Sequence, residues 1–335
     1  MKNALKPASI PVLALLASLT SIVLLAQPAS AWAAGNDNQA TAKKQHTWTL
    51  AELKAEAAKG KAWAQNNLGA RYSKGDGVKQ DDVEALKWYR LAAAKGQPDA
   101  MYNLAGLLET GTGVKKDLKE AYNLYLQAAE KGNADAQFSV GLALDMGRGV
   151  NRDDAAAVKW YRLAADQGHA DAQNNLGFMY EEGRGVKKDY AMAMKWYEKS
   201  AAQGAPIGQV AIGWMYQNGF GVPQNYAEAI KWYKKAAAQG DARGQISLGY
   251  MYSTGKGVPV DQVEAVRLNR LAAEQGDEYA QTNLGSQYEK GQGVAQDDVH
   301  AYMWFKLAKD AGNDNGAKNL PIRDEKDDIR PGDTG

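Results

Sequence analysis

The sequence predicts an all-α protein, an α/α solenoid of seven helix-turn-helix units that are each 36 residues long. Glycines recur with this period through all seven units, each unit shows a helical spacing of apolar residues twice, and no part of the array alternates as a strand does. A fixed period of this length is typical of solenoids, whose units bury their apolar faces against their neighbours. Three columns of glycines mark the period: Gly75 to Gly291, Gly77 to Gly293 and Gly96 to Gly312, each in steps of 36 residues.

Helix A, the first helix of each unit, is predicted from apolar residues at i, i+4 and i+8. In the first unit these are Ala64, Leu68 and Tyr72, and this spacing places them on one face of a helix. Gly69 follows the leucine directly. Because glycine has no side chain, we expect a second helix to approach closely at this point.

Helix B follows the glycine turn and begins after an aspartate or asparagine in the N-cap position, such as Asp81. Each cap of this kind contributes about 1 kcal/mol. A glutamate three residues later, as at Glu84, predicts a capping box in four units, and Glu84 is also spaced i, i+3 from Lys87 for an ion pair. The apolar stripe of the helix falls at i, i+3, i+4 and i+7, as in Ala85, Trp88, Tyr89 and Ala92.

The seven units occupy residues 61–313, and shorter helical segments stand at both ends of the array. Residues 48–60 resemble a lone helix B, and we expect them to form an N-terminal capping helix. Residues 314–320 resemble a truncated helix A and are expected to cap the other end. Residues 321–335 carry no apolar pattern, which predicts a disordered tail.

Residues 1–31 have the pattern of a secretory signal peptide. Lys2 and Lys6 form a basic start, and an apolar run extends from Ile10 to Ala26. Ala29-Ser30-Ala31 then has the A-x-A pattern of a cleavage site. Cleavage there predicts a periplasmic protein without an integral membrane segment; the alternatives are secretion from the cell, or an uncleaved segment that anchors the protein in the membrane. Residues 32–47 are mostly small and polar, which is typical of a disordered spacer.

The composition excludes several classes of site. The 40 Lys and Arg residues are balanced by 39 Asp and Glu residues, which argues against a protein held to nucleic acid by its charge. The chain has no cysteine, so disulfides, thiolate metal sites and cysteine nucleophiles are excluded. Its three histidines, His46, His169 and His300, have no spacing that would assemble a metal site. We therefore expect no catalytic residue, no metal and no cofactor.

One unit, Ala170 to Gly204, shows the pattern A-x-A-Q-x-x-L-G-x-x-Y-x-x-G-x-G-V and then D-x-x-x-A-x-x-W-Y. Because many of these columns match in every unit, the chain resembles the Sel1-like repeat, a relative of the tetratricopeptide repeat. The resemblance implies a right-handed superhelix of antiparallel helix pairs that binds other proteins. Secreted bacterial members of this family look like adaptors, signalling regulators, assembly factors for envelope machinery or immunity proteins against toxins.

A second apolar stripe on helix A predicts the partner-binding site. It lies away from the Leu68 column, in two columns that are four residues apart and are rich in aromatic and aliphatic residues in the third to sixth units. In a tetratricopeptide-like superhelix helix A lines the concave face, so this stripe would floor a groove, with an acidic rim that includes Glu181. The alternative is that these side chains pack against the next helix A. The predicted binding residues are Phe138, Leu142, Phe178, Val210, Trp214, Ile246 and Tyr250.

These features predict a non-enzymatic interaction scaffold, a monomeric adaptor or regulator in the bacterial cell envelope that binds another protein on its concave face. Two alternatives stay open. One is an immunity protein that neutralises an exported toxin, and the other is a binder of a cell-wall component or an acidic envelope polymer. A basic column on helix B motivates the polymer, although a solvated face with ion pairs inside each helix is the simpler interpretation. That column is Lys87, Lys159, Lys195, Lys231 and Arg267.

Overall fold

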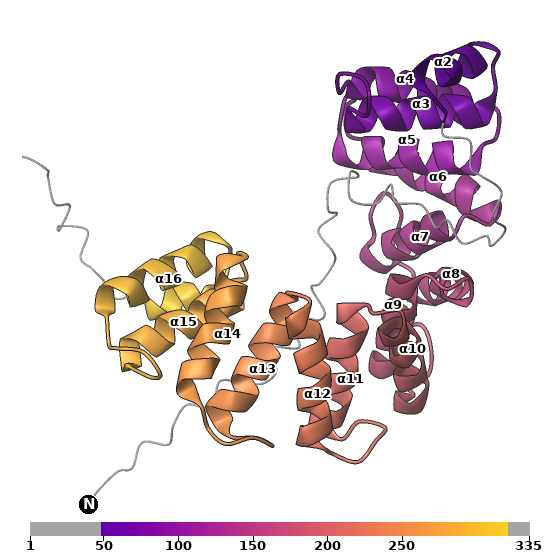
Figure 1. Cartoon of the computed structure of the whole chain (residues 1–335). Coiled ribbons are helices and arrows are strands. Elements are labelled where there is room, and N and C mark those ends of the chain that lie inside the picture. The colour runs from indigo at the N-terminus through magenta and orange to yellow at the C-terminus, as the bar shows by residue number, and fades with distance from the viewer. Residues whose placement is uncertain (1–47, 321–335) are drawn as a thin grey trace, which may run out of the picture. The chain divides into compact units, whose positions relative to one another are not determined.

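The computed structural model describes residues 48–320, and in this range it consists of sixteen helices without a strand (Figure 1). The predicted all-α solenoid with seven helical repeats is confirmed. The segments predicted as signal peptide, spacer and C-terminal tail, residues 1–31, 32–47 and 321–335, lie outside the described residues.

Each repeat contributes two helices, and one further helix stands at each end of the array. The helices A are α3 (Ala62–Lys74), α5 (Pro98–Thr110), α7 (Ala134–Met146), α9 (Ala170–Glu182), α11 (Pro206–Asn218), α13 (Ala242–Thr254) and α15 (Glu278–Lys290). The helices B are α4 (Asp82–Ala93), α6 (Leu118–Glu130), α8 (Asp154–Asp166), α10 (Tyr190–Ala202), α12 (Tyr226–Ala238), α14 (Gln262–Glu274) and α16 (Asp298–Asp310). The end helices are α2 (Leu50–Ala58) and α17 (Asp314–Asn319).

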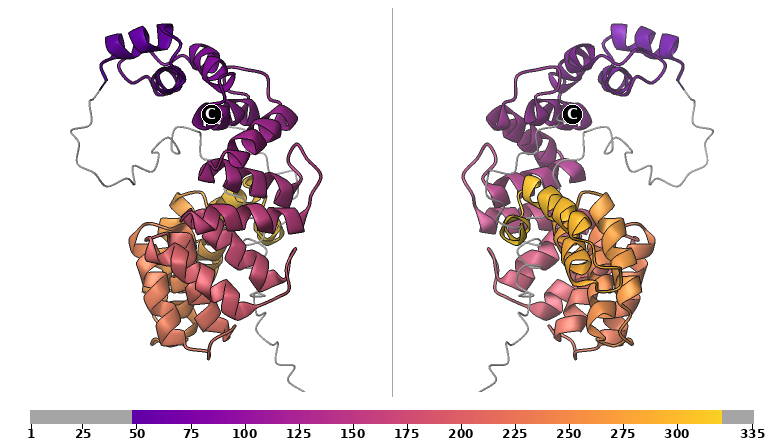
Figure 2. Two further views of the ribbon diagram at one scale, coloured as in Figure 1. Left: turned by 90° about the vertical axis from the view of Figure 1, so that its right-hand side faces the viewer. Right: turned by 90° about the vertical axis from the view of Figure 1, so that its left-hand side faces the viewer.

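The array is divided into two compact units. Of the described residues, 48–153 form the first unit and 154–320 the second, so the boundary falls inside repeat three, between α7 and α8. Within each unit every helix packs against the next helix along the chain. Figure 2 shows the helices of the second unit, drawn from pink to yellow, in two further views.

The close approach predicted at the glycine of helix A is confirmed. A Cβ atom at Gly69 would lie 2.8 Å from the ring of Tyr89 on α4, and a Cβ atom at Gly177 would lie 2.7 Å from the ring of Tyr197 on α10. The aromatic ring of helix B therefore fills the space that a side chain on helix A would need. Tyr89 and Tyr197 are buried as a result, which is how these short helices build a core from many small residues.

The two glycines of each G-x-G turn serve different purposes. The first is the C-cap of helix A and has a left-handed backbone, as at Gly219 with a φ of 72°, where side chains are disfavoured. The second lies against the start of helix B in the preceding repeat. A Cβ atom at Gly221 would lie 2.9 Å from the Cβ atom of Tyr190. The turn thus ends one helix and docks on the neighbouring repeat.

The N-caps of helix B are confirmed in α4, α6, α10, α12, α14 and α16. The capping box predicted at the start of this helix is wrong. The side chain of Asp81 accepts a hydrogen bond from the backbone N–H of Glu84 at 2.9 Å. Glu84 does not complete the box, because its carboxylate pairs with Lys87 at 2.8 Å, and glutamates of two further repeats pair in the same way. A complete box occurs instead between Thr49 and Glu52, at the start of α2.

A glutamine near the start of helix A links successive repeats. Its side-chain amide donates to a backbone carbonyl near the end of the preceding helix B, as from Gln173 to Ala165 at 3.0 Å and from Gln281 to Ala273 at 3.2 Å. Each of these carbonyls also accepts a turn hydrogen bond, as Ala165 does from the backbone N–H of Gly168 at 3.0 Å. The glutamine therefore adds a second donor to a carbonyl oxygen that has two lone pairs. This bond also accounts for the glutamine that recurs in the repeat pattern.

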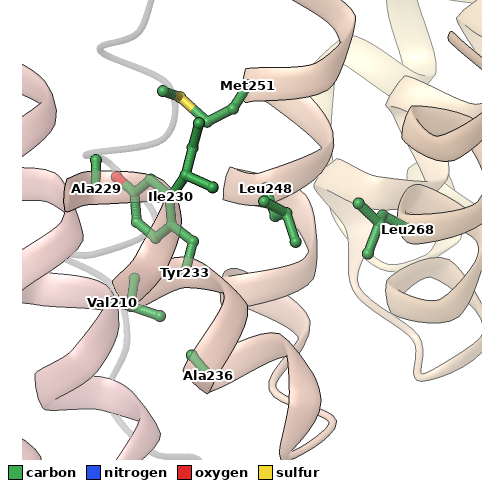
Figure 3. Packing of buried hydrophobic residues seen from close by; sticks show 8 residues of the cluster. All are labelled: Val210, Ala229, Ile230, Tyr233, Ala236, Leu248, Met251 and Leu268. Atoms are coloured by element: carbon green, nitrogen blue, oxygen red, sulfur yellow. The ribbon is translucent and has the colours of Figure 1, made fainter. Parts of the chain in front are cut away.

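The apolar core extends from repeat to repeat. At the beginning of the array, Leu53 and Ala57 of α2 cluster with Ala64 and Leu68 of α3, so α2 takes the place of a preceding helix B. In the second unit one cluster draws on four helices, α11 to α14 (Figure 3). Its members are Val210, Ala229, Ile230, Tyr233, Ala236, Leu248, Met251 and Leu268.

Candidate protein-binding edge

The seven residues predicted to bind a partner fall in both units. Phe138 and Leu142 lie on α7 in the first unit, and the other five lie on α9, α11 and α13 in the second. Four of the seven are between 3% and 5% exposed and have a packing role, whereas Leu142, Phe178 and Tyr250 are half-buried. The four are Phe138, Val210, Trp214 and Ile246.

Val210 packs between repeats, as the alternative interpretation of the apolar stripe expects. It belongs to the core cluster of Figure 3, where it lies among residues of α12, α13 and α14. A side chain in this place contributes to the joint between repeats rather than to an open surface. Partner binding at the seven residues stays a prediction, and the accessible members are the ones that can contact a partner directly.

Four of the seven residues share one repeat position, and three of these also share one kind of neighbour. Phe178, Trp214 and Tyr250 are 36 residues apart, and each is covered by the residue between the two glycines of its own turn. The guanidinium carbon of Arg184 lies 6.0 Å from the Phe178 ring, and the Phe220 ring lies 6.3 Å from the Trp214 ring. The ammonium group of Lys256 lies 5.0 Å from the Tyr250 ring and donates a hydrogen bond of 2.8 Å to its hydroxyl group.

The same turn residue also reaches the first residue of helix B in the preceding repeat. Arg184 binds the carboxylate of Asp154 through two hydrogen bonds, at 2.8 and 3.2 Å. Phe220 stacks on Tyr190, with centroids 4.9 Å apart and ring planes within 6° of parallel. Lys256 lies 5.9 Å from the centre of the Tyr226 ring. One position therefore joins adjacent repeats by an ion pair, an aromatic stack or a cation–π contact.

These contacts leave a row of half-exposed rings on the second unit. Tyr190, Phe220 and Tyr226 are not among the residues predicted from the sequence. Phe220 could have been found there, since it is the one apolar residue among seven turn positions that otherwise hold polar or charged residues. We name this row the aromatic edge and include the two lysines that lie over its rings. Its members are Lys188, Tyr190, Phe220, Tyr226, Tyr250 and Lys256.

Seven successive segments of the chain match the model of the Sel1 repeat, over residues 64–97, 98–133, 134–169, 170–204, 206–241, 242–277 and 278–313. The chain belongs to the Sel1 repeat family. Proteins with Sel1 repeats typically mediate protein–protein interactions. No curated protein sequence matches the chain.

Solved structures agree with this assignment. A protective antigen of uropathogenic Escherichia coli with an SLR fold is 40% identical, with a TM-score of 0.67, and the match covers 80% of this chain and 58% of that chain. A Sel1 repeat protein from Oxalobacter formigenes is 35% identical, with a TM-score of 0.64, over 80% of this chain and 78% of its own. An immunity protein from Pseudomonas aeruginosa is 21% identical, with a TM-score of 0.41, over 78% of this chain and 88% of its own.

The prediction of an acidic rim is wrong for one residue of this Sel1 repeat protein. Glu181 does not belong to an exposed rim, because it is 6% exposed at the end of α9. Its carboxylate accepts a hydrogen bond of 2.6 Å from the hydroxyl group of Tyr197. Burial raises the pKa of Glu181, and the bond from Tyr197 acts in the opposite direction.

The two histidines in the described part of the Sel1 repeat array stand at helix starts. His169 caps α9, where its Nδ1 atom accepts from the backbone N–H of Ala172 at 3.2 Å. His300 lies 2.7 Å from a carboxylate oxygen of Asp297, the N-cap of α16. Among residues 48–320 no group of His, Asp and Glu side chains is arranged to hold a metal ion, and no helix there has the length and apolarity needed to span a membrane.

At three positions the basic column on helix B forms ion pairs within its own helix, which is the simpler of the two interpretations. Lys87, Lys231 and Arg267 form ion pairs with the glutamate three residues before them. All three cations are exposed, and water screens pairs of this kind, so they contribute little to stability. Their charge is therefore largely balanced within their own helix.

Proposed function

We propose that this Sel1 repeat protein is a non-enzymatic adaptor or regulator of the bacterial cell envelope, and that its second unit binds a partner protein through the aromatic edge. The observation that carries the proposal is the row of half-exposed rings at the joints of repeats four to six. Aromatic side chains with few rotatable bonds dominate protein interfaces, because they bury a large area at a small cost in entropy.

The structure of the repeat supports this use of the rings. Phe220 is held on both sides, by Tyr190 from the preceding repeat and by the buried Trp214 from its own. Tyr250 is held by Lys256 and by the core cluster of α11 to α14. Rings that are fixed before binding lose little further freedom when a partner arrives. Trp214 then acts as a support for the binding residues.

The envelope location rests on the sequence alone. It assumes that the chain is exported by its first 31 residues and cut after Ala31. Mass spectrometry of the protein purified from a periplasmic fraction is expected to give an N-terminus at or near Trp32. If the protein is found in the cytoplasm with an intact N-terminus, the proposed location in the cell envelope is wrong.

The binding role is tested by affinity capture from an envelope extract with the chain from residue 32 onward. The variant Phe220→Ala with Tyr250→Ala is expected to weaken capture of a specific partner by about tenfold or more, as truncation of central interface rings does. The matched control is Leu271→Ala with Met303→Ala, which removes two exposed apolar side chains from α14 and α16 of the same unit.

Circular dichroism and thermal unfolding show whether both variants are folded. A partner retained equally by the wild type, the edge variant and the control would exclude the aromatic edge as the binding surface. A partner that proves to be an exported toxin would select the immunity alternative for the same surface.

A further inference from the structure

We infer that the aromatic edge takes an extended, acidic segment of its partner, with Lys256 and Lys188 as the groups that bind carboxylates. This inference rests on the proposed function, because it names the chemistry of the partner at the same surface. The supporting observation is that the positive charges along the row of rings form no ion pair with a carboxylate of the described residues.

Lys256 holds a positive charge that no carboxylate balances. Its ammonium group contacts the rings of Tyr226 and Tyr250 and donates to the Tyr250 hydroxyl group. No ion pair forms at this lysine within residues 48–320. The hydrogen bond to Tyr250 raises the pKa of Lys256, so the group stays charged at neutral pH.

At the equivalent position of repeat four, a carboxylate balances the positive charge. Arg184 is bound by both oxygens of Asp154, the first residue of α8. At the joint between repeats five and six the residue equivalent to Asp154 is Tyr226 of repeat five, so Lys256 meets a ring in place of a carboxylate. A carboxylate from outside the chain would supply the missing anion at Lys256.

Lys188 provides a second cation at the other end of the edge. It is exposed, and its ammonium group lies 4.7 Å from the centre of the Tyr190 ring. Glu182 and the buried Glu181 act on it from nearby, but neither carboxylate forms an ion pair with it. Like Lys256, it presents its charge beside a ring, where an anion with an apolar neighbour can bind both groups.

The spacing of these groups favours an extended chain. Lys188 belongs to the turn of repeat four, Phe220 to the turn of repeat five and Lys256 to the turn of repeat six. The two lysines are therefore two repeats apart, with Phe220 in the turn between them. A peptide with carboxylates and rings in alternation can follow successive turns and place an apolar side chain on Phe220.

The experiment measures binding of fluorescein-labelled peptides to the chain from residue 32 onward, by fluorescence anisotropy at low salt. The probe is a twelve-residue peptide of alternating Asp and Tyr, and the comparison peptide replaces every Asp by Asn. We expect the acidic peptide to bind about fivefold more tightly, which is about 1 kcal/mol shared by two exposed ion pairs.

The variant Lys188→Gln with Lys256→Gln is expected to remove this preference for the acidic peptide. The matched control is Lys195→Gln with Lys231→Gln, two exposed lysines on α10 and α12 of the same unit, and it is expected to keep the preference. Lys188→Arg with Lys256→Arg is also expected to keep it. Equal binding of both peptides by the wild type, or an unchanged preference in the glutamine variant, would overturn the inference.

A third probe separates an acidic peptide from an acidic glycan. Oligogalacturonate has the carboxylates without the rings, and it is expected to bind more weakly than the acidic peptide. Tighter binding of oligogalacturonate would overturn the choice of a peptide. If the lysine variant still captures the envelope partner while Phe220→Ala with Tyr250→Ala does not, the proposed function holds and only the acidic chemistry fails.

Discussion

Repeats four and six of the second unit use the same backbone position in opposite ways. In repeat four, Arg184 closes the joint to the preceding repeat through an ion pair with Asp154. In repeat six, Lys256 closes it by lying against the rings of Tyr226 and Tyr250. An ion pair neutralises the positive charge within the fold, whereas an aromatic ring holds a cation in place and leaves its charge accessible to a ligand.

Both joints depend on the second glycine of the turn, and its substitution is expected to have the largest effect. A Cβ atom at Gly257 would lie 2.6 Å from the Cβ atom of Tyr226, and Gly257 also has a φ of 73°. We expect Gly257→Ala to lower the free energy of unfolding of the second unit by about 3 kcal/mol, from backbone strain and the clash together. Urea unfolding followed by circular dichroism measures it.

Gly240 is the matched control for this substitution. Its φ of 84° is just as unfavourable for a side chain, but a Cβ atom there would meet no atom within 4 Å. Gly240→Ala is therefore expected to cost only about 1 kcal/mol, the strain of the left-handed backbone. Equal losses in the two variants would show that the turn does not need its close contact with the preceding repeat.

Converting one joint into the other is expected to have a smaller effect on stability. The variant Tyr226→Asp with Lys256→Arg copies the pair of Asp154 and Arg184 into repeat six. We expect the free energy of unfolding to change by less than about 1 kcal/mol, since a partly exposed ion pair replaces a partly exposed cation–π contact. Binding of the acidic peptide is expected to fall, because the new arginine already has a carboxylate. A converted joint that bound the peptide as before would contradict this comparison.

The smallest effect is expected at Glu181 and depends on pH. Because burial raises its pKa above the ordinary value of 4.5, the folded state binds the proton more tightly than the unfolded state does. The stability of the wild type is therefore expected to fall as the pH rises from about 4.5 toward neutrality. Glu181→Gln is expected to reduce this fall, as measured by thermal unfolding at a series of pH values; the part due to Asp277, whose pKa burial also raises, is expected to stay.

Repeat five provides a natural precedent for that change. Gln217 stands at the position of Glu181 and accepts a hydrogen bond of 3.0 Å from the hydroxyl group of Tyr233. The reciprocal variant Gln217→Glu is expected to acquire the fall in stability that Glu181→Gln loses. A pH profile that neither variant changes would place the titrating groups elsewhere.

The fold was predictable because its signals repeat seven times in one register. The two helices of each unit, their N-caps and the close contact at Gly69 follow from periodicity and from the size of single residues. The capping boxes were not predictable, because Glu84 has two partners within reach and the sequence does not say whether Lys87 or the N-cap backbone holds it. The contact of the second glycine with the preceding repeat depends on how repeats stack, which local spacing does not determine.

The binding residues were harder to predict for a related reason. An aromatic residue on helix A, such as Trp214, departs from its column whether it faces a partner or a neighbouring repeat, and here it is buried. The turn residue that covers it, Phe220, comes six positions later, and its second partner, Tyr190, comes thirty positions earlier. Such pairs become visible only when the stacking of repeats is known.

The glutamine bonds between repeats bear on how an array of this kind changes its length. Gln65 of the first repeat donates to the carbonyl group of Ala57 in α2 at 3.2 Å, just as Gln137 donates to Ala129 within the array. The first repeat therefore meets the same surface at the end of the array that an interior repeat meets. Duplication or deletion of a whole 36-residue segment keeps this glutamine bond at the junctions, so the gene for such a protein can gain or lose repeats without a new end having to evolve.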